Sequence, residues 1–341
     1  MAIGSGLGSQ VQFGLETTYG TAVTPTVALE ATSVGLELQV EHMMSEGLRA
    51  GLRVQRGDRT VVNRKGVEGS LDMDITSNAQ ARWLIQAMGD SRAVSTIKTN
   101  PGSGAVYLYT MHLGDPASLS PMTIQTGVAD VAGNVRRMDA VGCFITEFSL
   151  SNEIDGILTG SFTVNGRDYV PSASAVTAAS YATGTEPLVF TGGAVTIDGT
   201  SIPVRSYELS VTHGYDTERY QINSTSLKSR PIINAKDEIT LTLEMEFGSD
   251  SGATWATDDL VTKFRAGTKL DDIVGTWTGT TAIESTTYPY LKASVAEAII
   301  TAATPTIEGP EIIGLSVELM AMDNGTDQPL VLEYQSSENL S

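Results

Sequence analysis

The stretch GVEGSLDMDITSNAQARWLIQAMGD, residues 66–90, limits the possible folds more than any other part of the chain. In its first half, apolar residues such as Leu71 and Met73 alternate with acidic or small polar ones. A period of two places the apolar side chains on one face of a β-strand and the carboxylates on the other. The second half changes to helical spacing, with Ser77 as the expected N-cap and Gly89 as the expected left-handed cap. The stretch therefore predicts a half-buried strand followed by a short helix.

The same pattern occurs a second time in the chain. EITLTLEMEF, residues 238–247, alternates in the same way, and a second helical stretch follows it, with Thr257 as its cap and Gly267 after its end. The strand-like segments LELQVEH and YELSVTH, which contain Glu37 and Glu208, are separated by a similar offset of roughly half the chain. Matches in the same order at similar offsets indicate an internal tandem duplication. We therefore expect two similar units.

The boundary between these units is expected in a segment rich in Pro, Ala, Ser and Thr, which has the composition of a linker. This assigns residues 1–170 to a first β unit, 171–187 to the linker and 188–341 to a second β unit. Each unit is expected to close with a hairpin, which turns around Asp155–Gly156 in the first and Asn324–Gly325 in the second.

Composition restricts the class of protein. The 341 residues allow two ordinary domains, and many short runs of Val, Thr and Ile favour a mainly β fold with two short helices. The single cysteine, Cys143, excludes an internal disulfide framework and is expected to be a buried apolar residue. The N-terminus has no signal-like segment, and no run approaches the ~20 apolar residues of a membrane helix, so we expect a soluble protein made in a cytoplasm. A net charge of −19 disfavours tight binding of DNA.

Residue patterns for catalysis are few. The chain contains no HExxH pattern and no CxxC pair, and two of its three histidines stand at matching strand ends, which favours a structural role. Asp72 with Asp74, and Glu244 with Glu246, are carboxylate pairs that could bind calcium or perform acid–base work. Because such pairs recur on several strands, they suit a surface property better than one site. We therefore expect no catalytic residues, no metal and no cofactor.

Nearly all charged residues on the polar faces of the predicted strands are acidic. The set consists of Glu37, Glu41, Glu68, Asp72, Asp74, Glu147, Glu208, Glu238, Glu244, Glu246 and Glu318. If sheets of several copies joined edge to edge around an axis, these acids would line a channel, and closure would also remove exposed sheet edges. A negative wall repels DNA phosphates, so a duplex would slide without sticking. The alternative is that these are ordinary solvated strand faces.

Basic residues gather in one predicted loop, residues 48–65. Six of the 21 basic residues of the chain lie there: Arg49, Arg53, Arg56, Arg59, Arg64 and Lys65. The loop contains no aromatic residue for base stacking, and the rest of the molecule is acidic, which argues against nucleic acid as its partner. The loop is expected to contact an acidic protein surface, such as another copy of the chain, or else to be a solvated loop.

Several segments also show a family resemblance: TTYGTAVTPT near the start, SLSPMTIQTG at residues 118–127, MDAVGCFITEFSLSNEIDG, and the strand-then-helix order of residues 66–90. In these the chain resembles a tail tube protein, or major tail protein, of long-tailed non-contractile bacteriophages. The resemblance covers the first unit well and the second in outline. It implies that each unit is a β-sandwich or barrel flanked by one α-helix, and that six units form a ring whose stacking builds a hollow, DNA-conducting tube.

The chain departs from the common one-unit pattern of this family. By analogy with duplicated members, the resemblance implies homotrimeric rings with pseudo-sixfold symmetry, stacked through the basic loop. It also implies a tape-measure protein, a tail terminator and a distal tail protein as partners, transit of DNA through the lumen without specific binding, and no membrane. The protein would be assembled in the host cytoplasm and reside in the tail of the virion.

Three functions remain open from the sequence. The leading hypothesis is a structural, self-assembling tube protein that is not an enzyme. The alternative is a two-domain β-sandwich module that binds or decorates a virion or cell surface. A hydrolase that uses the Asp72–Asp74 carboxylate pair ranks third.

Overall fold

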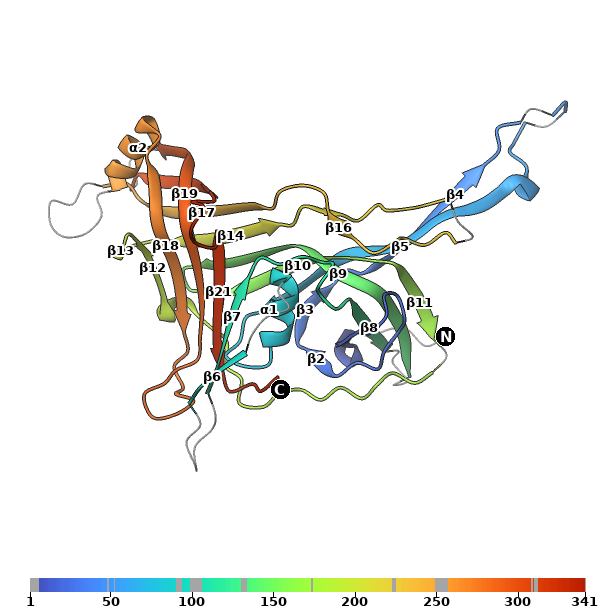
Figure 1. Cartoon of the computed structure of the whole chain (residues 1–341), viewed down its shortest axis with the longest axis horizontal. Helices are drawn as coiled ribbons and strands as arrows, with labels where there is room; N and C mark the ends of the chain where they lie inside the picture. Colours follow the sequence, from blue (N-terminus) through green and yellow to red (C-terminus); the bar gives the residue numbers. More distant parts are fainter. Residues whose placement is uncertain are drawn as a thin grey trace.

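A computed structural model describes most of the chain. The described residues are 6–47, 49–51, 53–89, 94–98, 106–129, 134–172, 174–222, 225–248, 257–307, 309 and 312–340. This part of the chain is mainly β, with two α-helices, and its sheets are open rather than closed into a barrel (Figure 1). The expected mainly β class with two short helices is thereby confirmed.

The elements follow one another along the chain in two series. The first series is η1 (3₁₀, Gly6–Gly8), β1 (Gln10–Leu15), β2 (Val27–Leu29), β3 (Ala31–Val34), β4 (Glu37–Met44), η2 (3₁₀, Gly57–Arg59), β5 (Thr60–Asp74), α1 (Ala81–Met88), β6 (Val94–Lys98), β7 (Val106–His112), β8 (Met122–Ala129), β9 (Val135–Glu153), β10 (Thr159–Gly166) and β11 (Asp168–Ser172). The second series is η3 (3₁₀, Phe190–Gly192), β12 (Gly193–Ile197), β13 (Thr200–Ile202), β14 (Ser206–Thr212), β15 (Tyr215–Asp216), β16 (Ile232–Ile233), β17 (Glu238–Glu246), α2 (Thr257–Ala266), β18 (Lys269–Thr278), β19 (Tyr290–Thr306), β20 (Gly314–Ala321) and β21 (Leu330–Ser336).

One antiparallel sheet, here called the central sheet, runs through both halves of the chain. Its order is β3 and β4 at one edge, then β5, β10, β9, β14, β17, β20 and β19. The two halves meet where β9 pairs with β14, with Leu150 opposite Leu209. A second link between the halves is the pairing of β7 with β21.

The two longest strands, β9 and β19, each pair with two sets of neighbours. The first part of β9 pairs with β8 and β11, and its second part pairs with β10 and β14. In the same way, the first part of β19 pairs with β18 and β21, and its last part pairs with β20. The pairs β1–β2 and β1–β8 likewise have counterparts in β12–β13 and β12–β18. The pairing order of the second half thus repeats that of the first.

The apolar face of the central sheet forms the core. Leu71 and Met73 point into it, as the alternation predicts, and Cys143 is buried there too. Helix α1 covers this face in the first half (Figure 1), and its Trp83 packs edge-on against the ring of Phe162, with 5.6 Å between centroids. Apolar burial of this extent is the main favourable contribution to folding.

Helix α1 ends as predicted but does not begin as predicted. Gly89 has the left-handed conformation of a C-cap, with φ of 69°. The N-cap assignment of Ser77 is wrong, because its Oγ accepts a hydrogen bond from the N–H of Glu186 at 3.0 Å, before the helix begins. The carboxylate of Glu338, from the far end of the chain, instead accepts from the N–H of Ala81 at 2.9 Å. A free helical N–H prefers such a negative partner.

The two expected closing hairpins have different outcomes. β9 and β10 form the first one, and Asp155 has the positive φ, 62°, that its tight turn needs. The second is wrong: β20 and β21 do not pair, because both edges of β20 are taken by β17 and β19. β21 pairs with β19 and β7 instead.

The segment expected to be a linker, residues 171–187, is tied to the first half. Its first two residues belong to β11, which pairs with β9. Further along, the carbonyl oxygen of Thr177 accepts hydrogen bonds from the side-chain amides of Gln10 and Gln12, at 2.5 and 2.6 Å. These contacts fix the path of the segment.

Candidate assembly surfaces

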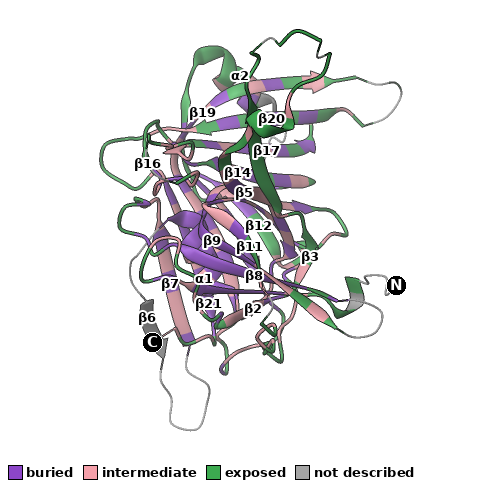
Figure 2. Ribbon diagram, turned by 90° about the vertical axis from the view of Figure 1, so that its right-hand side faces the viewer, coloured by how far each residue is buried: buried purple, intermediate pink, exposed green. Residues whose placement is uncertain are grey.

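All eleven acids of the predicted set lie on the solvent face of the central sheet. Residues directly opposite each other in neighbouring strands share a face, and the register links one strand to the next. Glu37 faces Glu68 across β4 and β5, for example, and Thr242 lies between Glu208 and Glu318. Figure 2 shows the resulting alternation of buried and exposed residues along β14 and β17. The structure therefore gathers these acids, from both halves, on one surface, here called the acidic face.

The acids of this surface differ in exposure. Glu68, Asp72 and Asp74 are half-buried, whereas the other eight are exposed. Two of the half-buried acids have polar partners: Asp72 accepts a hydrogen bond from Ser161 Oγ at 2.6 Å, and Glu68 accepts one from Asn165 Nδ2 at 2.8 Å. These contacts hold the side chains along the sheet.

Three cations also lie beside the acidic face, which the sequence pattern did not indicate. Lys228 Nζ lies 3.1 Å from Glu68, a guanidinium nitrogen of Arg64 lies 3.5 Å from Glu41, and one of Arg205 lies 3.3 Å from Glu246. Glu208, Glu244 and Glu318 form no ion pair with any residue that the structure describes. The negative field over these three acids is therefore not reduced by a partner cation among the described residues.

The basic segment lies at the tip and along one strand of a projecting ribbon. β4 and the first part of β5 extend beyond the body of the molecule (Figure 1) and are here called the arm, residues 40–65. The expected loop is wrong for its last six residues, because Val61 and its neighbours pair with β4, which makes Arg64 and Lys65 strand residues. Arg49, Arg53 and Arg59 are exposed.

The arm also exposes large apolar side chains. Met43 and Val54 are 55% and 78% exposed, and Met44, Val61 and Val62 are exposed as well. An isolated two-stranded ribbon gains little stability by itself, and a cluster of exposed apolar residues marks a contact surface. The arm therefore has the composition of a docking element.

A segment of the second half lies across the base of the arm. Residues 214–236, here called the crossing segment, join β14 to β17 by way of β15 and β16. The carbonyl oxygen of Lys65 accepts a hydrogen bond from Tyr220 Oη at 3.0 Å, and the N–H of Lys65 donates to the carbonyl oxygen of Ser226 at 2.9 Å. Lys228, which belongs to this segment, is buried. The sequence did not predict this burial, because a single lysine in a polar stretch forms no recognisable pattern.

The central sheet has two edges that pair on one side only among the described residues. One is the outer edge of β3 and β4, which pair with β5 alone. The other is the end of β19, residues 302–306, which pairs with β20 but lies beyond the last residue matched to β18. Such edges expose N–H and C=O groups that can pair with another chain.

Titratable groups inside the molecule have structural partners. The carboxylate of Glu16 accepts hydrogen bonds from Gly20 N–H, Gly142 N–H and Thr123 Oγ; burial raises its pKa, although these donors oppose the rise. Buried His213 is hydrogen-bonded through Nε2 to the carbonyl oxygen of Ala87 at 2.7 Å. No group of three or more His, Cys, Asp or Glu that could hold a metal occurs in the described part of the chain. None of the helices seen there is long and apolar enough to span a membrane.

The acidic face, two sheet edges that pair on one side only among the described residues, and an arm with exposed apolar and basic side chains are surfaces that suit association with other chains. The chain belongs to the phage tail tube protein family, whose sequence model matches residues 6–321. A search of curated proteins finds no match. Membership of this family confirms the resemblance seen in the sequence and makes the chain a structural component of a phage tail.

Proposed function

We propose that copies of this chain join edge to edge into rings, and that stacked rings form a tail tube with the acidic face lining the lumen. The observation that carries the proposal is that eleven acids from both halves share one face of an open sheet whose two outer edges pair on one side only among the described residues. An open sheet with unpaired ends can be extended by further copies, and closure into a ring satisfies every edge.

We infer the number of chains in a ring from two repeated units per chain and from the six units per ring that the sequence resemblance implies. We infer a tandem duplication, in which β14, β17, β20 and β19 correspond to β3–β4, β5, β10 and β9. The pairing of β9 with β14 then serves as the pattern for the contact between copies, in which β19 of one copy pairs with β3 and β4 of the next. Three chains would supply six units, which gives a homotrimeric ring with pseudo-sixfold symmetry.

We propose the lumen from this arrangement and the remaining partners from the family resemblance. Acids along the wall would repel the phosphates of passing DNA, so that DNA transits during ejection without specific binding. The arm, with its exposed arginines, would contact the next ring. A tape-measure protein, a tail terminator and a distal tail protein are the proposed partners, with assembly in the host cytoplasm. No catalytic role is proposed for Asp72 and Asp74.

Electron microscopy of negatively stained, concentrated protein tests ring formation. We expect rings and short tubes whose class averages show threefold symmetry. Leu38→Asp, at the β4 edge, should prevent rings without unfolding the chain, because Leu38 is 44% exposed. Phe264→Asp on α2, where the side chain is 37% exposed, is the matched control and should still form rings. Persistent monomers of the parent protein, even with tail partners present, would refute the proposal.

A further inference from the structure

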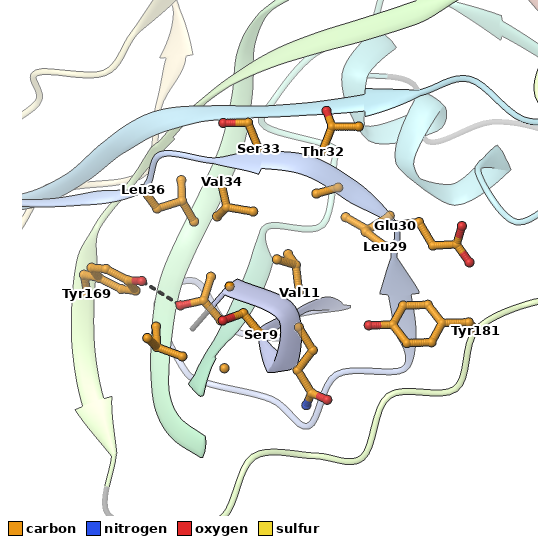
Figure 3. A pocket seen from close by; sticks show the side chains of 16 residues that line it. Ser9, Val11, Leu29, Glu30, Thr32, Ser33, Val34, Leu36, Tyr169 and Tyr181 are labelled. Atoms are coloured by element: carbon orange, nitrogen blue, oxygen red, sulfur yellow. Dashed lines mark hydrogen bonds between the residues drawn. The ribbon is translucent and has the colours of Figure 1, made fainter. Parts of the chain in front are cut away.

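A cavity of about 660 Å³ lies at the end of the first half, between β1, β2, β3, β8 and β11. Figure 3 shows Val11, Leu29 and Val34 around it, with Tyr169 and Tyr181 on opposite sides. Val34 and Tyr181 are 39% and 43% exposed, so apolar surface lies open there. We call this cavity the first-half pocket.

The second half contains a corresponding cavity of about 270 Å³, the second-half pocket. The same paired strands line both. Val11 pairs with Leu29 across β1 and β2, and Val195 pairs with Ile202 across β12 and β13; all four residues line their pockets. The two cavities therefore occupy equivalent places in the repeated pairing order.

At three matched lining positions the first-half pocket has the smaller side chain. When the strands of the two halves are aligned by their registers, three lining positions of the first half have an aromatic counterpart in the second. Gly6 corresponds to Phe190, Val34 to Tyr207, and Val128 to Trp277. At three equivalent positions an aromatic ring in the second-half pocket is thus replaced by a hydrogen or an isopropyl group. Val128 is also 50% exposed, whereas Trp277 is buried.

Residues of the first half complete the lining of the second-half pocket. Asn152, near the end of β9, and Ile154, in the turn between β9 and β10, both line it. Trp277 Nε1 donates a hydrogen bond to Asn152 Oδ1 at 3.1 Å, and the N–H of Ile154 donates to the carbonyl oxygen of Arg205 at 3.2 Å. This turn follows directly after the part of β9 that pairs with β14.

The equivalent turn for the first-half pocket is the one between β19 and β20. Both β9 and β19 have a register shift, and the first residue after it is Glu147 in β9 and Ala302 in β19. When these two residues are aligned, Asn152 of β9 corresponds to Ile307, which directly follows β19. Ile307 and Ile312, at the two ends of this turn, are 74% and 67% exposed. The turn cannot reach the pocket of its own chain, because β19 and β3 lie at opposite edges of the central sheet.

We propose that the first-half pocket receives the end of β19 of a neighbouring copy, with Ile307 packed against Val128. The inference rests on the proposed edge-to-edge rings and names the contact that sets their register. Complementarity supports it, since the larger pocket contains Val11, Val34 and Val128 among its polar lining residues, and isoleucine stands at position 307 where the internal contact has asparagine. An exposed isoleucine gains free energy when it is buried against such apolar side chains.

Cysteine cross-linking tests the contact directly. A Val128→Cys chain mixed with an Ile307→Cys chain should form an interchain disulfide under mild oxidation, identified by mass spectrometry of the linked peptides. The native Cys143 is buried and does not compete. Ile222→Cys in place of Ile307→Cys is the control: Ile222 is fully exposed, and this mixture should give at most about a tenth of the cross-link.

A transplanted pair gives a second test with its own readout. Val128→Trp should fill the pocket and raise the protein concentration needed for rings at least about tenfold. Adding Ile307→Asn recreates the internal Trp–Asn pair and should restore much of this loss. Thermal melting of each variant shows that the fold is intact. Failure of the second substitution to rescue a folded Val128→Trp variant would count against the contact.

The outcomes separate this inference from the proposed function. Rings without the 128–307 cross-link would overturn the inference alone and leave the pocket to another occupant, such as a different tail protein. The cross-link without rings would support the contact and overturn the ring proposal. Absence of both would overturn both.

Discussion

Lys228 shows how a single side chain ties the two halves together. Its ammonium group is buried and lies 2.8 Å from Glu218 Oε1, 3.1 Å from Glu68 Oε1 and 3.2 Å from Asn165 Oδ1. A buried charge is costly unless it is paired and hydrogen-bonded. Since Glu68 and Asn165 belong to the first half, the crossing segment depends on this lysine for its position.

Replacement of Lys228 should show how much its contacts with the first half contribute to the free energy of unfolding. Lys228→Met should lower the free energy of unfolding by about 1–3 kcal/mol, because it leaves the half-buried Glu68 without its cation. Lys269→Met is the matched control, since Lys269 is 53% exposed and pairs with Glu297 at the surface; its effect should stay below about 1 kcal/mol. Urea denaturation of the two variants measures both effects, and equal losses would contradict the structural role.

At the scale of elements, the pairing of β5 with β3 and β4 requires the backbones at Gly69 and Gly35 to lie very close together. Gly69 has φ of 155°, and a Cβ added there would lie far inside van der Waals contact of the carbonyl oxygen of Gly35. This is the point where the chain passes from β3 to β4 beside β5. Only a residue without a side chain allows both strands to pair with β5 there.

A methyl group at this point should therefore disturb the edge of the central sheet. Gly69→Ala is expected to lower the free energy of unfolding by about 2–4 kcal/mol, through steric overlap with backbone that cannot move aside. Gly57→Ala is the control, because a Cβ there meets nothing within 4 Å; its effect should lie within about 0.5 kcal/mol. Thermal and urea unfolding give the comparison, and a neutral Gly69→Ala would show that the edge can rearrange.

Local patterns predicted elements well and their partners poorly. The alternation in β5 and the glycine after α1 depend on nearby residues alone, so the sequence was sufficient for them. Ser77 was misassigned because its partner, Glu186, is distant in the chain, and tertiary contacts override local capping preference. The β20–β21 hairpin failed for the same reason, since β17 competes for β20. The acidic set was predictable from alternation, whereas burial of Lys228 was not.

At the scale of the whole molecule, the acidic face should affect passage of DNA rather than folding. Glu208 on β14 and Glu318 on β20 are exposed and lie on either side of Thr242 on β17. The double variant Glu208→Lys with Glu318→Lys should keep the melting temperature within a few degrees, because neither side chain is buried. Its lysines would attract phosphates, so virions that carry it should eject DNA more slowly.

Exposed acids outside the central sheet provide the matched control. Asp259→Lys on α2 with Asp271→Lys on β18 makes the same change in net charge, and ejection should proceed at the parental rate. Ejection kinetics from purified virions distinguish the two variants. Equal rates for both would mean that the acidic face does not line the path of DNA.

The β9–β14 pairing, which joins the halves within one polypeptide, affects how such a protein could polymerise. In a ring of these chains, every second seam would form during folding of a single molecule, independently of protein concentration. Nucleation of a ring would then bring together three molecules rather than six, so it would respond less steeply to dilution. Only the intermolecular seams could open, or be weakened by mutation, without unfolding a subunit. Growth and disassembly of the ring would therefore be controlled by half of its seams.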